Sequence, residues 1–139
     1  METQRNTCQK NSCHSRDIRD SRYMRAESLA NFGFFEVDLL SGWSYWSPGM
    51  YRITGFDNET PPPSMENLVD WVLPADQRNF RLFFEEVSQE GNIGFLEFRH
   101  QERADSVTSF EVHLEPETDD EGSVIRLFGI LQEMSPDKV

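Results

Sequence analysis

The spacing of apolar positions around residue 35 predicts two strands joined by a tight turn. Phe35, Val37 and Leu39 occupy every second position, a period of two that is typical of a strand with one buried face. Ser41-Gly42 interrupts this pattern, and a β-favouring run at residues 43–47 follows it. The two runs are therefore expected to form a hairpin across the Gly-containing turn.

Three helices are predicted next. Ser47 and Ser64 each precede a helical segment and can cap its first free N–H groups, and Pro48 suits a first helical turn. The third and longest segment runs from residue 74 to about 89, with apolar side chains at i, i+3, i+4 and i+7. These side chains are Phe80, Phe83, Phe84 and Val87. A glycine ends the first and the third segment.

The remaining pattern predicts three more strands, at residues 94–102, 107–114 and 124–134. The first two alternate apolar and polar side chains, which indicates one buried face. The last is apolar on both faces, with Leu127 and Leu131 on one side and Phe128 and Ile130 on the other. A strand of this kind is expected at the centre of a sheet, with both of its faces covered.

The order of aromatic, glycine and polar residues from Gly33 to Phe56 resembles the opening of a PAS domain. The matching residues are Gly33, Phe35, Val37, Asp38, Gly42, Trp46, Ser47, Tyr51, Gly55 and Phe56. With the later strands, the resemblance extends over about residues 28 to 135. It implies an α+β fold, namely a PAS-like five-stranded antiparallel sheet with short helices on one face and an N-terminal flanking helix. The first and last strands would then be adjacent at the centre of the sheet.

Three later motifs extend this resemblance. Leu73-Pro74-Ala75-Asp76 stands where the family often reads H-P-D-D, although Leu73 replaces the usual histidine, and Asp76 is expected to accept hydrogen bonds from free amides at the helix start. Residues 97–99 resemble the family's E-x-R strand. Gly129 and Glu133 occupy the glycine and acidic places of a G-x-x-x-D-I-T ending. Because this acidic position joins the sheet to an output helix in the family, the resemblance assigns signal relay to Glu133.

The chain divides into four expected segments: a disordered tail at residues 1–15, a flanking helix at 16–30, a PAS domain at 31–135 and a C-terminal tail at 136–139. The flanking helix has a thin apolar stripe, which includes Ile18, Met24 and Leu29. So thin a stripe needs a partner to be stable. These three residues are therefore expected to support a homodimer, and an intramolecular cap over the sheet is the alternative.

The distribution of charge excludes several partners. The 139 residues carry a formal net charge of −12, yet the first 30 contain six basic and four acidic residues, so the other 109 carry −14. Such an acidic body should repel nucleic acid and anionic membrane surfaces. No apolar run approaches the length needed to span a bilayer, and the N-terminus lacks the apolar segment of a secretory signal, so a cytoplasmic location is expected.

Few residues could carry chemistry, and no enzymatic activity is expected. His100 and His113 lie on predicted strands among charged residues and are expected to face solvent. Cys8 and Cys13, beside a histidine, lack the fourth ligand of a zinc site. The acidic residues at 115–121 lack the ligand spacing of a calcium loop and are expected to form a solvated hairpin.

The resemblance also implies that no cofactor is present. Flavin-binding members of the family need a cysteine in an N-C-R-F helix, and no cysteine follows Cys13. Haem-binding members usually place a histidine on the helices that correspond to residues 64–90, where this chain has none. The interior is therefore expected to bind a small organic ligand or to be filled by its own side chains.

The sequence thus predicts a non-enzymatic sensory or interaction module of bacterial-type signal transduction, which binds a small molecule or a protein partner and relays the signal through its termini. Its output is expected from a kinase or cyclase, in cis if the chain is a fragment or in trans from a partner. A ligand pocket would be lined by Phe35, Tyr51, Ile53, Leu68, Trp71, Phe80 and Phe84. The alternatives are a dimerisation scaffold with a filled core, and a small cone-shaped α+β enzyme or binding fold with a polar pocket.

Overall fold

The computed structural model describes residues 22–134, which fall into two units. One is the N-terminal helix at residues 22–30, and the other is the body that begins at Asn31. The expected tails and the part of the predicted flanking helix before residue 22 lie outside the described residues. No helix within residues 22–134 is both long and apolar enough to cross a membrane.

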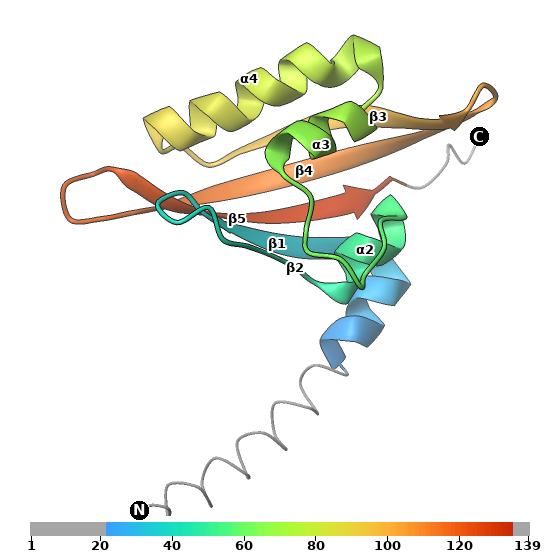
Figure 1. The fold of residues 1–139 in the computed structure, drawn as a ribbon, viewed down its shortest axis with the longest axis horizontal. Coiled ribbons are helices and arrows are strands. Elements are labelled where there is room, and N and C mark those ends of the chain that lie inside the picture. Colours follow the sequence, from blue (N-terminus) through green and yellow to red (C-terminus); the bar gives the residue numbers. More distant parts are fainter. Residues whose placement is uncertain (1–21, 135–139) are drawn as a thin grey trace, which may run out of the picture. The chain divides into compact units, whose positions relative to one another are not determined.

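The body is an α+β fold around one five-stranded antiparallel sheet, as predicted (Figure 1). Its elements are β1 (Phe32–Asp38), β2 (Ser44–Trp46), α2 (Pro48–Thr54), α3 (Met65–Trp71), α4 (Pro74–Glu90), β3 (Gly94–Arg103), β4 (Ser106–Thr118) and β5 (Val124–Glu133). The strand order is β2-β1-β5-β4-β3, which confirms that the first and last strands are neighbours and that β5 is central. Figure 1 shows α3 and α4 over one face of this sheet, called the inner face below.

The helix boundaries follow from the capping residues that the sequence offers. The Ser47 hydroxyl accepts from the Met50 N–H at the start of α2, and the Ser64 hydroxyl accepts from the Asn67 N–H at the start of α3. Gly55 and Gly91 adopt the left-handed conformation that follows α2 and α4, with φ of 84° and 75°. All four positions agree with the predicted boundaries.

The first turn of α2 lies directly on β1. Besides capping α2, the Ser47 hydroxyl accepts from the Phe34 N–H at 3.0 Å, and the Ser47 N–H donates to the Phe34 carbonyl at 2.9 Å. Gly33 makes this approach possible, because a Cβ atom there would lie 2.2 Å from the Met50 backbone nitrogen. The serine and the glycine together fix α2 against the end of the sheet.

The β1–β2 turn begins at Leu39, two residues before the Ser41-Gly42 break that the apolar pattern predicts. β1 ends at Asp38, and Leu39 lies in the turn with 38% of its surface exposed. The Asp38 carboxylate accepts from the backbone N–H groups of Leu40 and Ser41, at 2.9 and 3.1 Å. The hydrogen bond from Ser41 has the largest effect on the pKa of Asp38, followed by that from Leu40. Both lower this pKa because they favour the charged form of the carboxylate. The turn is therefore closed by an aspartate that also ends the strand.

Asp76 does not cap α4, contrary to the prediction. Its carboxylate instead binds Arg99 of β3, accepting from the backbone N–H at 2.9 Å and from the guanidinium at 2.9 and 2.8 Å. The hydrogen bond from the Arg99 side chain is the main reason why the pKa of Asp76 is lowered. Two motifs 23 residues apart are thus joined, and the first turn of α4 is fixed to the outer edge of β3.

Asp76→Asn is expected to reduce the free energy of unfolding by about 1–2 kcal/mol at pH 7, after allowance for the solvent exposure of Arg99. Because the folded-state pKa of Asp76 is lowered, its contribution is present above the unfolded pKa of about 4 and is lost as the pH falls through the folded value. The difference between variant and wild type should therefore shrink from pH 7 to pH 3 in urea titrations.

Asp70→Asn is the control for this experiment, because Asp70 is an exposed residue of α3. It should change stability by less than about 0.5 kcal/mol at either pH. An Asp76→Asn variant as stable as wild type at pH 7 would contradict the assigned role of the Asp76–Arg99 pair.

Candidate functional site

The seven residues predicted to line a pocket all lie in the core between the inner face and the helices. Phe35, Leu68, Phe80 and Phe84 are buried, and Tyr51, Ile53 and Trp71 are partly buried against them. They come from β1, α2, α3 and α4. The structure therefore brings the predicted residues into one hydrophobic core, and whether they enclose a ligand remains a prediction.

Aromatic rings form a continuous cluster at the centre of this core, here called the aromatic cluster. It consists of Phe35, Trp71, Phe80, Phe84, Phe98 and Phe110. Phe80 is central, with its ring centroid 5.0 Å from that of Phe84 and 4.9 Å from that of Phe98. These distances are in the favourable range for aromatic pairs. Phe98 and Phe110 are strand residues that the pocket prediction left out, although the sequence places both on inward-facing positions.

Phe35 connects the aromatic cluster to the central strand. Its ring packs on Gly129 of β5, where a Cβ atom would lie 2.2 Å from the ring. On its other side the ring is stacked with Phe84 of α4, with centroids 6.4 Å apart. A change in the packing of α4 would thus reach β5 through a single side chain.

His100 faces the core rather than solvent, which corrects the sequence prediction. Its Nδ1 lies 2.6 Å from the Trp71 carbonyl, so Nδ1 is assigned as the donor. Its ring is stacked on the Trp71 ring at 4.2 Å. The Trp71 indole N–H in turn donates to the Thr54 carbonyl at 3.1 Å. Trp71 therefore joins the end of α2 to β3.

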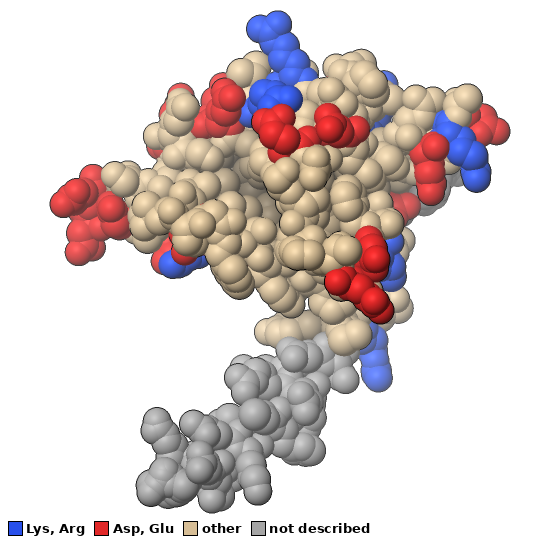
Figure 2. All heavy atoms as spheres, in the orientation of Figure 1, with Lys and Arg blue, Asp and Glu red and all other residues tan. Residues whose placement is uncertain are grey.

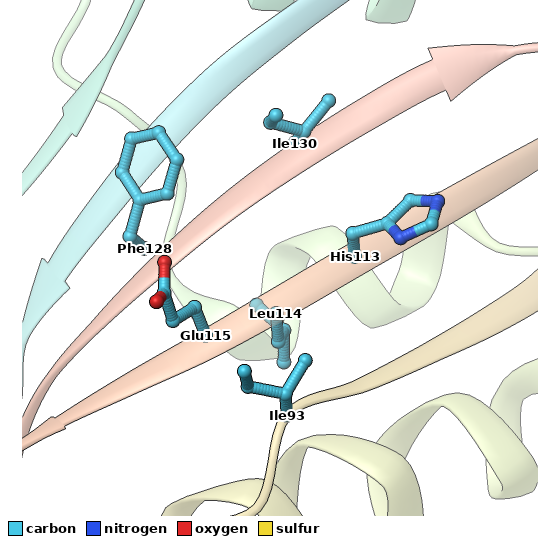
Figure 3. A pocket seen from close by; sticks show the side chains of 6 residues that line it. All are labelled: Ile93, His113, Leu114, Glu115, Phe128 and Ile130. Atoms are coloured by element: carbon cyan, nitrogen blue, oxygen red, sulfur yellow. The ribbon is translucent and has the colours of Figure 1, made fainter.

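The outer face of the sheet carries a hollow of about 260 Å³ that the sequence did not predict (Figure 3). It is lined by Ile93, His113, Leu114, Glu115, Phe128 and Ile130. In Figure 3 the Phe128 ring, which comes from β5, lies beside the Glu115 carboxylate, which comes from β4. None of the seven predicted pocket residues lines this outer hollow.

His113 stands at the outer hollow and is exposed, as predicted. Its Nε2 lies 3.0 Å from a Glu111 carboxylate oxygen, and its ring is stacked on Phe95 with centroids 5.5 Å apart. Glu111 of the same strand and Phe95 of β3 therefore both contact the imidazole.

A second hollow, of about 320 Å³, lies beside α2 and includes one predicted pocket residue, Tyr51. Its lining residues are Pro48, Tyr51, Arg52, Phe56, Asp57 and Asn58. The Tyr51 hydroxyl donates to the Thr60 carbonyl at 3.2 Å. The hollow is thus bounded by α2 and the loop that follows it.

The residues predicted for dimerisation lie on the N-terminal segment, and the residue predicted for relay ends β5. Met24 and Leu29 are 49% and 82% exposed on the N-terminal helix, and Ile18 lies outside the described residues. Glu133 is the last residue of β5, where its N–H donates to the Asn31 carbonyl at 2.8 Å. Glu133 thus stands four residues beyond Gly129 on the strand that Phe35 contacts.

No group of three or more histidine, cysteine, aspartate or glutamate side chains within residues 22–134 is arranged to hold a metal ion. The two cysteines and His14 lie outside that range. The acidic residues at the β4–β5 turn gather at one end of the molecule in Figure 2. There Asp119 accepts from the backbone N–H groups of Glu121 and Ser123, as in an ordinary hairpin turn.

Comparison with known proteins gives a family match over more than half of the chain. Residues 44–131 match the family model described as the PAS fold. No curated protein matches the chain.

Three solved structures illustrate the likeness of fold. A sensory box histidine kinase/response regulator from Burkholderia thailandensis E264 has a TM-score of 0.62 at 18% identity, over 81% of this chain and 84% of that one. The N-terminal domain of a diguanylate cyclase with PAS/PAC sensor from Marinobacter aquaeolei has a TM-score of 0.64 at 18% identity, over 73% and 94%.

The third is an RNA-binding light-oxygen-voltage receptor, with a TM-score of 0.65 at 13% identity over 77% of this chain. The match spans only 31% of that receptor's length. At these sequence identities the similarity shows a shared fold alone.

Proposed function

Because this chain belongs to the PAS fold family, we propose that it is a non-enzymatic sensory and interaction module of bacterial-type signal transduction. It acts in the cytoplasm and relays a signal to a kinase or cyclase output, in cis or in trans. The similar structures from a histidine kinase and a diguanylate cyclase support this assignment. A small organic ligand is the proposed signal.

The observation that carries the proposal is the continuity from the aromatic cluster to the end of β5. Trp71 and Phe84 belong to helices, Phe35 belongs to β1, and all three are in contact with the core. A ligand among these rings would favour one packing of α3 and α4 over another, and a difference in affinity between two packings shifts their populations. Phe35 transmits the change in helix packing to Gly129, and β5 carries it to Glu133.

A homodimer is part of this proposal. Ile18, Met24 and Leu29 supply apolar side chains on the N-terminal segment, and β5 exposes Phe128 and the partly buried Ile130 on its outer face. Two copies that pair through these surfaces would cover both, and closed two-fold pairing is the commonest form of oligomer.

A dimerisation scaffold with a filled core is the second candidate, and the ring contacts favour it. Phe80 and Phe110 are each only 2% exposed and touch rings on more than one element. A core packed in this way is stable without a ligand. The two candidates differ in whether the purified protein carries a small molecule.

Native mass spectrometry of the purified chain tests the proposal. The wild type is expected to carry an additional small mass, which solvent extraction then identifies. Trp71→Leu should lose that mass, because Trp71, at the end of α3, bonds to both α2 and β3. Trp43→Leu is the matched control, since Trp43 is 56% exposed in the β1–β2 turn, and should retain it. A wild type without any bound mass would favour the scaffold.

A further inference from the structure

The outer hollow is a mostly apolar depression with one carboxylate at its edge (Figure 3). Ile93, between α4 and β3, and Phe128 and Ile130 of β5 supply apolar side chains to it. Ile93 is 75% exposed and Phe128 is 36% exposed, so both offer apolar surface to a molecule in the hollow. Glu115 is the one acidic residue among the six described residues that line it. A bound molecule would therefore meet apolar carbon and a single negative charge.

The Glu115 carboxylate is available to a cation. Among residues 22–134, its side chain makes no ion pair and no hydrogen bond. Arg126 of the neighbouring strand pairs instead with Glu117 at 2.6 Å and lies 4.0 Å from Asp38. Two carboxylates thus already oppose the charge of Arg126, and Glu115 remains free to attract the positive charge of a ligand.

Phe128 places an aromatic ring beside this carboxylate. Glu115 of β4 and Phe128 of β5 are direct cross-strand partners, and Figure 3 shows the ring next to the carboxylate. Phe34 supports the ring from the β1 side, with centroids 6.0 Å apart. The face of an aromatic ring attracts a cation, and a carboxylate attracts it by charge. Both groups therefore favour an ammonium group.

The size and the electrostatic surroundings of the hollow narrow the ligand further. Its volume of about 260 Å³ is just below the roughly 300 Å³ at which sites for drug-sized ligands begin. The 109 residues from Asn31 onward carry a formal net charge of −14, which repels anions. A small primary amine with an apolar body, which is protonated at neutral pH, meets both conditions.

We propose that the outer hollow is a binding site for a small organic ammonium ion. The ammonium group lies between the Glu115 carboxylate and the Phe128 ring, and the apolar part of the ligand lies against Ile93 and Ile130. None of the residues that line the outer hollow belongs to the predicted core pocket. The site is therefore separate from the ligand of the proposed function.

Ligand-observed NMR with phenethylammonium tests this site. Binding should be saturable, with a Kd below about 1 mM. Phenethyl alcohol and hydrocinnamate carry the same ring without a positive charge, and they should bind at least about fivefold more weakly. Ethylammonium has the charge without the ring and should also bind more weakly, because it buries less apolar surface.

The protein concentration in this experiment is one at which sedimentation velocity finds the chain monomeric. The homodimer of the proposed function would cover Phe128 and Ile130, so the hollow must be open when the amine is added. The site is then tested whether or not a homodimer forms at higher concentration.

Two substitutions locate the binding. Glu115→Gln keeps the shape of the side chain and removes its charge, so it should weaken phenethylammonium binding at least about fivefold. Phe128→Leu keeps an apolar side chain without the ring and should weaken binding about threefold or more. Glu97→Gln is the matched control, because Glu97 is an exposed carboxylate of β3 that does not line the hollow, and it should bind as wild type does. Circular dichroism establishes that each variant is folded.

Three results would overturn the inference. The first is a wild type that shows no saturable binding of phenethylammonium. The second is a Glu115→Gln variant that binds it as tightly as wild type does, which would place the amine elsewhere. The third is equal affinity for hydrocinnamate, which would mean that charge plays no part. Native mass spectrometry of the core ligand does not depend on Glu115 or Phe128, so failure of either test leaves the other standing.

Discussion

Gly33→Ala is expected to destabilise the body by at least about 3 kcal/mol, which is a large part of the stability of a small domain. The added methyl group would lie 2.2 Å from the Met50 nitrogen, 2.6 Å from the Met50 Cα and 2.7 Å from the Gly49 carbonyl carbon. All three are backbone atoms, so no side-chain rotation relieves the overlap. α2 would have to move away from β1, and the hydrogen bonds through Ser47 would be strained.

Thermal unfolding followed by circular dichroism measures this effect, and a loss of about 3 kcal/mol should lower the Tm by at least about 10 °C. Gly42→Asn is the control, because Gly42 has a φ of 82° and a Cβ atom there would meet open space. Asparagine tolerates this conformation and should cost about 1 kcal/mol or less. Equal Tm values for Gly33→Ala and wild type would mean that α2 does not lie on β1 as described.

Trp71→Ala is expected to reduce the free energy of unfolding by about 3 kcal/mol, toward the lower end for a truncated aromatic because Trp71 is only partly buried. The change removes the stack on His100, the edge contact with Phe110 at 5.0 Å and the hydrogen bond to the Thr54 carbonyl. The end of α2, α3 and β3 would lose the side chain that they share.

Urea unfolding followed by far-ultraviolet circular dichroism measures this loss without relying on tryptophan emission. Trp43→Ala removes the same side chain from an exposed turn and should change stability by less than about 1 kcal/mol. If both variants lost the same small amount, Trp71 would not contribute to the core. A stability loss in Trp71→Ala without any change in ligand affinity would indicate that Trp71 fills the core and does not line a pocket.

The sequence predicted most of the fold because the informative signals are local. Ser47, Ser64 and two glycines mark helix ends by short-range hydrogen bonds and backbone conformation, which do not depend on the rest of the chain. The central place of β5 followed from its two apolar faces, since only an inner strand of a covered sheet needs both.

Long-range contacts were the part that local patterns could not supply. Asp76 has the position of a helix cap, but its carboxylate is better placed to bind a guanidinium and a strand N–H 23 residues away. The charged neighbours of His100 in the sequence indicated an exposed side chain. Its parity with Leu96 and Phe98 on β3 was the available signal that it faces inward. The outer hollow depends on strand register across β4 and β5, which no single segment reveals.

The Asp76–Arg99 contact also changes what can happen at the edge of the sheet. An edge strand with free backbone groups invites another strand to add to it, which is a route to aggregation. At β3 the Leu73 N–H donates to the Arg99 carbonyl at 2.7 Å, and the Arg99 N–H donates to Asp76, so the outward backbone groups of Arg99 are already used. The opposite edge, β2, is only three residues long. The Asp76–Arg99 contact therefore closes the middle of one edge of the sheet to strand addition, and the other edge is too short to offer much template.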